Sequence, residues 1–138
     1  MDNRFKKIHV FRVAPGQELL TEILKYCRQN GITSGIIIGI IGSAKSARLN
    51  YLKELPGKYV SENYEGPLEI VAAQGSIALL GSEIIIHIHI LLASQTACFG
   101  GHLAEARIFS TAEVTIGELN TQLNRYADTY TGLNELLQ

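Results

Sequence analysis

The stretch EIIIHIHILLASQTACFGGHLAE, residues 83–105, holds the most apolar run of the chain and three of its four histidines. His87 and His89 are two residues apart, and side chains at that spacing on a β-strand point to the same face. His102 follows the run, directly behind Gly100-Gly101. Two interpretations are open from the residues: the three imidazoles bind a metal ion, or they are core side chains that hydrogen-bond to the backbone or a carboxylate.

The composition is that of a globular protein. The chain has 138 residues, of which 46% are hydrophobic and 18% charged, so we expect one domain, 1–138, that is long enough to bury a core. The low charge fraction indicates apolar surface that another copy of the chain covers. The net charge is −1, which leaves only a local basic patch for any role in nucleic-acid binding.

Nothing in the sequence indicates export or a membrane. Cys27 and Cys98 form no C-x-x-C pair, and no apolar segment of signal-peptide length follows the charged start MDNRFKKIHV. Residues 84–93 are apolar but reach only about half the length that spans a bilayer. We therefore predict a soluble, cytoplasmic protein with no membrane partner.

One helix is predicted early in the chain. Pro15-Gly16 precedes residues 17–30, and Asn30-Gly31 provides a stop signal, because glycine adopts the left-handed conformation that ends helices. Apolar residues keep a helical period at Leu19, Leu20, Ile23, Leu24 and Cys27. We expect a long amphipathic helix that packs on one face of a sheet.

The rest of the chain has strand patterns. Strands are expected at 5–13, 34–42, 46–53, 68–80 with a bulge at Gly75, 83–93, 102–109 and 111–118, and weaker signals suggest an extended piece at 59–64, a last strand at 122–128 and a helical turn at 133–136. Runs of strands after a single helix predict an α+β domain with a strongly bent, largely antiparallel sheet.

Several motifs together resemble a known family. They are PGQELL at the helix start, IIIGIIGSA, GPLEIV, the HIH strand, GGHL and TAEVTI. The combination resembles the plants-and-prokaryotes conserved (PPC) domain, which accompanies AT-hook motifs in plant DNA-binding proteins. The resemblance covers roughly residues 5–119, and HIH with GGHL is its most specific part.

The resemblance carries expectations about fold, assembly and metal. It implies a bent antiparallel sheet, a homotrimer, and kinship of fold with acetolactate decarboxylase, whose zinc is held by histidines in a similar pattern. Carried over to this chain, the ligands are His87, His89 and His102, and the cofactor is zinc or another divalent transition metal.

Two differences from the plant proteins argue against DNA as the partner that the resemblance implies. The Arg-Gly-Arg-Pro element of an AT-hook is absent from the sequence. The plant motif Gly-Arg-Phe-Glu-Ile-Leu corresponds to GPLEIV at 66–71, which lacks the arginine and the phenylalanine.

Other charged residues are candidates near the site. Glu105 lies three residues beyond His102 and is a candidate ligand, hydrogen-bond partner of a ligand or general base, although on a strand it would face away from His102. Glu69 and Glu83 are further candidates for hydrogen-bonding a ligand imidazole. His9 stands alone in the first strand, and we interpret it as structural.

A group of cations is a candidate anion site. Lys45 and Arg48 lead four cations within fourteen residues, the others being Lys53 and Lys58.

The sequence therefore supports two functions. One is a trimeric DNA-binding or transcription-associated module with a metal site. The other is a metal-dependent lyase, such as a decarboxylase, acting on a small oxo-acid. In that enzyme a glutamate or Arg48 would handle protons or the substrate carboxylate.

Overall fold

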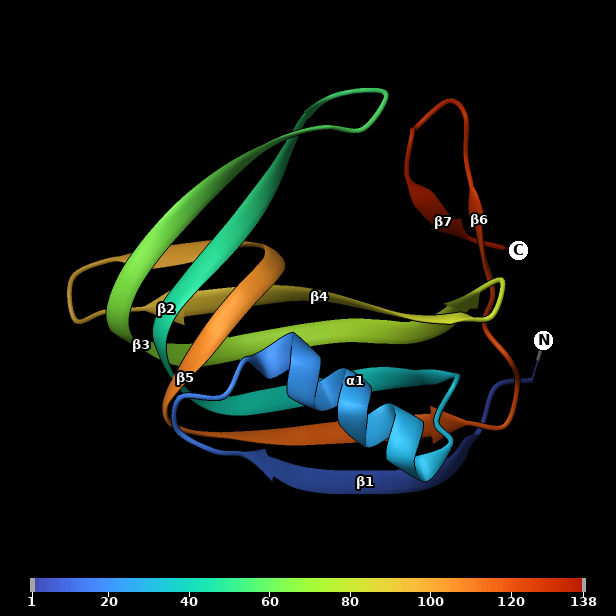
Figure 1. The fold of residues 1–138 in the computed structure, drawn as a ribbon, viewed down its shortest axis with the longest axis horizontal. Helices are drawn as coiled ribbons and strands as arrows, with labels where there is room; N and C mark the ends of the chain where they lie inside the picture. Colours follow the sequence, from blue (N-terminus) through green and yellow to red (C-terminus); the bar gives the residue numbers. More distant parts are fainter. Residues whose placement is uncertain (1, 138) are drawn as a thin grey trace.

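A computed structural model describes residues 2–137, and most of them lie in antiparallel β-strands (Figure 1). The elements are, in chain order, β1 Phe5–Val13, α1 Leu19–Asn30, β2 Gly35–Glu54, β3 Lys58–Leu80, β4 Glu83–Ala93, β5 Cys98–Leu119, β6 Arg125–Ala127 and β7 Asn134–Leu136.

The main sheet curls until two of its strands meet. Its order is β1-β5-β2-β3-β4, and β4 also pairs with β5, so that β2, β3, β4 and β5 form a closed arrangement. The β-branched run in β2 supplies buried residues such as Ile37 and Ile40, and β4 supplies Ile88 and Ile90. Alternation along each strand sends these side chains into the core and their neighbours to the outer face.

The expected fold class is wrong. The α+β prediction required a long helix, but α1 has only 12 residues, whereas β2, β3 and β5 have 20, 23 and 22. The predicted breaks do not end the strands: 34–42 and 46–53 are one strand, as are 102–109 and 111–118. The chain bends at irregularities, such as the register shift between Ala44 and Ser46, and continues its pairing beyond them.

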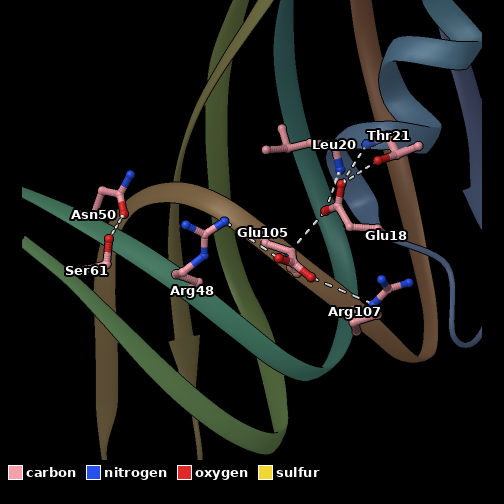
Figure 2. A network of polar contacts seen from close by, with 9 residues as sticks. Glu18, Leu20, Thr21, Arg48, Asn50, Ser61, Glu105 and Arg107 are labelled. Atoms are coloured by element: carbon pink, nitrogen blue, oxygen red, sulfur yellow. Dashed lines mark hydrogen bonds and ion pairs between the residues drawn. The ribbon is translucent and has the colours of Figure 1, made fainter.

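The start and the end of α1 agree with the signals in the sequence. Glu18 caps its start by accepting hydrogen bonds from the Thr21 and Leu20 amides at 2.8 and 3.1 Å, and also from the Ala106 amide of β5 at 3.1 Å (Figure 2). Gly31, with φ 66°, ends it in the left-handed conformation. One carboxylate thus starts α1 and fastens it to β5.

The predicted bulge at Gly75 lies elsewhere. The register of β3 and β4 shifts between Ile70 and Ala72, whereas Gly75 pairs regularly with Ile88. A Cβ atom at Gly75 would collide with the backbone carbonyl oxygen of His87. Glycine is needed there because β4 approaches closely, which fixes the position of the histidine strand.

The tail forms a hairpin beside the end of the sheet where β3 turns into β4 (Figure 1). The expected strand at 122–128 is present in shorter form as β6, but the expected helical turn at 133–136 is wrong, since β7 pairs with β6 there. The Gly57 amide donates to the Thr131 carbonyl at 2.8 Å, and Arg125 donates to the Ser76 hydroxyl at 2.8 Å. The hairpin is therefore tied to the turn between β2 and β3 and to the last part of β3. Within residues 2–137, no helix is long and apolar enough to cross a membrane.

Candidate metal centre

Two of the candidate ligands lie side by side on β4. His87 is half-buried and His89 is exposed, while Ile88 and Ile90 between and beyond them are in the core. The spacing therefore places both imidazoles on the outer face of the sheet, with ring centroids 5.1 Å apart.

The pairing of β4 with β5 places the third histidine beside the first two. His102 on β5 is the direct cross-strand partner of His89. Its ring centroid is 4.9 Å from that of His87 and 5.6 Å from that of His89. One ligand atom from each of the three lies within 4.8 Å of the others. We call His87, His89 and His102 the histidine cluster.

His87 and His102 favour the neutral form of imidazole, which is the form that binds a metal ion. Burial, assisted by the charges of His102, His89 and Arg125, lowers the pKa of His87 to about 4. Burial and then His89 also lower the pKa of His102. Among residues 2–137, no protein group hydrogen-bonds to any of the three rings.

His9 differs from the histidine cluster, as predicted. It is 6% exposed, and its Nδ1 and Nε2 atoms lie 3.2 Å from the Tyr26 hydroxyl and 3.1 Å from the Glu118 carboxylate. Both of its nitrogens have protein partners, so the structural interpretation of His9 is confirmed.

Two cavities each touch more than one residue of the histidine cluster. One, of about 400 Å³, lies between His87 and His102 on one side and residues 132–135 of the β6–β7 hairpin on the other. We call it the hairpin cavity. A second cavity, of about 420 Å³, touches all three histidines and also Tyr59 and Leu133. A ligand of small-molecule size can therefore approach the cluster.

The two glycines before His102 lie inside a strand. Gly100 and Gly101 lie within β5, opposite Leu91 and Ile90 of β4. A Cβ atom on Gly101 would lie 2.9 Å from the Tyr51 ring. Gly101 therefore gives room to a tyrosine beside the cluster.

The predicted acidic partners lie away from the histidines. Figure 2 shows Glu105 between two arginines. Its carboxylate oxygens lie 3.7 Å from Arg48 and 3.8 Å from Arg107. Glu69 is exposed and pairs with Ala93 at the other end of β4. Neither glutamate lines a cavity that touches the histidine cluster.

The predicted cation group is divided by ion pairs. Arg48 faces Glu105, and Lys58 is 2.9 Å from Glu54. Lys45 is exposed, and within residues 2–137 it forms no ion pair, nor does Lys53.

Arg125 is a polar residue of the site that the sequence did not indicate. It begins β6 and lines the hairpin cavity together with His87 and His102. It follows His102 by 23 positions in the weakly patterned tail, and no motif or spacing pointed to it.

The donor set fits a divalent transition metal. Neutral imidazole suits zinc, copper, iron and nickel, and three protein ligands with an open position are typical of catalytic zinc. Among residues 2–137, no fourth histidine, cysteine or carboxylate joins the cluster. The hairpin cavity touches His87 and His102, and the second cavity touches all three histidines.

Comparison with known proteins gives the chain close structural neighbours. The sequence profile of the Plants and Prokaryotes Conserved (PCC) domain matches residues 2–120. A structure described as a metal-containing protein, from Archaeoglobus fulgidus, is 30% identical, with a TM-score of 0.92 and coverage of 99% of this chain and 97% of that one. A plant- and prokaryote-conserved (PPC) protein from Pyrococcus horikoshii is 31% identical, with a TM-score of 0.88 and coverage of 99% and 96%.

Two further similarities are narrower in what they show. A candidate DNA-binding protein from Bacteroides thetaiotaomicron is 21% identical, with a TM-score of 0.88 and coverage of 97% of this chain and 96% of that one, which shows the fold alone. The bifunctional protein GlmU of Synechococcus sp. (strain JA-3-3Ab) is 31% identical over 133 residues, 94% of this chain. The match covers only 20% of GlmU, so the chain spans about a fifth of the length of the curated relatives it matches.

Proposed function

The chain belongs to the Plants and Prokaryotes Conserved (PCC) domain family, and we propose that it binds one zinc ion, or another divalent transition metal, on the histidine cluster. The observation that supports this most directly is the convergence of three imidazoles, each without a protein hydrogen-bond partner in the described chain, on a single point of the sheet. The Archaeoglobus fulgidus neighbour described as metal-containing adds support from a protein of the same fold.

The ring nitrogens of the histidine cluster have no protein hydrogen-bond partner in residues 2–137. A half-buried imidazole usually pairs its ring nitrogens with protein groups, because an unpaired buried polar atom costs about 1–3 kcal/mol. His87 and His102 are half-buried without such a partner in residues 2–137, and their ligand atoms and that of the exposed His89 lie within 4.8 Å of one another, as a group that could hold one ion. Their lowered pKa values keep His87 and His102 in the neutral form that ligates.

Titration calorimetry with zinc chloride tests the proposal. We expect the metal-free protein to bind one ion per chain, and the His87→Ala/His89→Ala variant to bind none. The matched control is His9→Ala, which removes a histidine of the same sheet and should leave the stoichiometry unchanged. A wild-type protein without affinity for zinc would reject the proposal.

The hairpin cavity favours a catalytic use of that metal as the second candidate function. Bound on the histidine cluster, the ion would supply Lewis acidity toward the carbonyl oxygen of a substrate. The chain's own contribution would be to enclose and orient a small oxo-acid between the histidines and residues 132–135, as a lyase requires. Incubation of zinc-loaded protein with a set of small oxo-acids, followed by carbon dioxide release, tests this use. Release by the His87→Ala/His89→Ala variant would contradict it.

We propose a homotrimer as the assembled form. Large apolar side chains are exposed on the outer side of the sheet, with Val10 67%, Ile41 69% and Val71 59% exposed. Exposed apolar surface of this kind supports self-association. Light scattering should give three times the 15.1 kDa chain mass, and Ile41→Glu should lower it. A wild-type mass of one chain would contradict the trimer.

DNA association has less support than metal binding. Two of the four grouped cations face carboxylates, which leaves Lys45 and Lys53 for phosphate contacts. We expect no gel shift with duplex DNA at low salt. A salt-sensitive shift that Lys45→Gln and Lys53→Gln reduce would restore the DNA-binding module as the better proposal.

A further inference from the structure

The guanidinium of Arg125 lacks an anionic partner in the hairpin cavity. Its Nη1 donates to the Asn134 carbonyl and its Nη2 to the Ser76 hydroxyl, both at 2.8 Å. Its Nε is buried, and no group of the described residues 2–137 accepts a hydrogen bond from it. No carboxylate of residues 2–137 lies within ion-pair distance of it, although Glu135 lines the same cavity. The tail therefore holds a charged group in place with only neutral acceptors.

A charged arginine with only neutral partners is unfavourable in these surroundings unless an anion binds to it. Burial lowers the pKa of Arg125, and the charge of Glu135 opposes this effect without forming an ion pair. A partly desolvated cation with neutral partners is costly, and a ligand carboxylate would offset that cost with charge-assisted hydrogen bonds.

We propose that Arg125 binds the carboxylate of a small organic acid that occupies the hairpin cavity beside the histidine cluster. The cavity volume of about 400 Å³ limits the ligand to a small molecule. Ile85, Ile86 and Leu133 line it with apolar surface that suits a short carbon chain, and Asn50 offers polar contacts. The inference rests on the proposed metal site, because it assigns the ligand class of that same site.

Arg125 suits this role better than Arg48, the arginine that the sequence favoured. Arg48 faces Glu105 at 3.7 Å and lines a different cavity, with Ser46 and Asn63. A carboxylate that binds Arg48 would compete with Glu105, whereas one that binds Arg125 would meet an unpaired charge. Arg125 also lies outside residues 2–120, the part that the family profile matches. The acid-binding group is thus supplied by the tail.

The test is a nuclear magnetic resonance titration of zinc-loaded, ¹⁵N-labelled protein with pyruvate. The chemical shifts of the Arg125 Nε–H group and of the amides of residues 132–135 report binding. Pyruvamide, which has the same carbonyl without the negative charge, is the matched probe. We expect a saturable shift with pyruvate and at least about tenfold weaker binding of pyruvamide.

Three variants distinguish a role of Arg125 in ligand binding from a role in holding the hairpin in place. Arg125→Gln should weaken pyruvate about 10- to 100-fold and leave pyruvamide unchanged. Arg48→Gln should leave both affinities unchanged. Ser76→Ala removes the hydrogen bond that holds the guanidinium but keeps its charge, so pyruvate should still bind within a fewfold. Equal losses in Arg125→Gln and Ser76→Ala would show a structural role and overturn the proposal.

Further results would overturn or support the role of Arg125. No saturable shift with pyruvate, or equal affinity for pyruvamide, overturns the inference while the zinc content of the same sample upholds the metal site. If the protein takes up no zinc, the proposed function fails. Pyruvate is then titrated into the metal-free protein, and loss of its binding in Arg125→Gln supports the inference, whereas no such loss overturns it.

Discussion

Two histidine environments on the same sheet differ in what satisfies the ring nitrogens. His9 is buried between the Tyr26 hydroxyl and the Glu118 carboxylate, and both of its nitrogens are hydrogen-bonded. The histidine cluster is more exposed, yet within the described chain its rings find only one another. The structural histidine is thus buried with a protein partner on each ring nitrogen, whereas the candidate ligands are more exposed and have no such partner in the described chain. The protein partners explain the difference chemically, because a paired nitrogen has no lone pair left for an ion.

The largest expected effect concerns zinc-linked stability. At free zinc about 1,000 times above Kd, the wild-type protein should gain about 4 kcal/mol of unfolding free energy. His102→Ala should lose this gain, because it removes a ligand, whereas His9→Ala should keep the gain on a lower baseline. Thermal unfolding with and without zinc measures both. A zinc response that survives in His102→Ala would break the distinction between the two environments.

The next effect concerns the strand that carries the cluster. Gly75→Ala should cost about 3 kcal/mol and weaken zinc binding, because its methyl group collides with the His87 carbonyl. Gly39→Ala is the matched control, since a Cβ atom there meets nothing within 4 Å. Urea unfolding and zinc titration of the two variants test this. Equal stability of both would show that β4 tolerates displacement.

A smaller effect is expected at the structural histidine. Hydrogen bonds from Lys6 and then His9 hold the pKa of Glu118 below its ordinary value of 4.5. The ionised carboxylate thus stabilises the fold above pH 4.5, and this stabilisation is lost as the pH falls through the lowered pKa. Glu118→Gln should cost about 2 kcal/mol at pH 7 and less at pH 3, without changing zinc affinity.

Urea unfolding of the wild-type protein and Glu118→Gln across this pH range gives the difference. A gap that stays constant down to pH 3 would argue against the ionised pair.

The smallest effect is expected at the exposed arginine. The side chains of Arg48 and Glu105 are 45% and 42% exposed, and such pairs contribute less than about 1 kcal/mol. Arg48→Gln should therefore change neither stability beyond that amount nor zinc affinity. A marked loss of zinc from Arg48→Gln would connect this pair to the cluster and blur the contrast between environments.

The candidate site could be predicted only where local geometry decides it. The two-residue spacing places His87 and His89 on one face of any strand, so their proximity follows from the sequence. The position of His102 depends on the register of β4 against β5, which only the resemblance to a family indicated. Arg125 reaches the cavity through tertiary contacts of the tail, and no local pattern reports those.

The errors in the fold share one physical cause. Turn-forming residues such as Gly66-Pro67 predict breaks, but the cross-strand pairing of β2 with β3 continues past them in a bent strand. The helix was predicted at the right place, since its period and its Gly31 stop are local signals. The dominance of long strands was missed, because pairing between distant segments overrides the local signals.

X-ray absorption spectroscopy of the zinc-loaded protein tests the central claim most directly. Three imidazole nitrogens at about 2.0–2.1 Å from zinc, with no sulfur, are expected for the wild-type protein and for His9→Ala. The imidazole signal should be lost in His87→Ala/His89→Ala. A sulfur ligand at about 2.3 Å, which Cys98 would supply, or a spectrum that the double variant leaves unchanged, would contradict a metal centre on the histidine cluster.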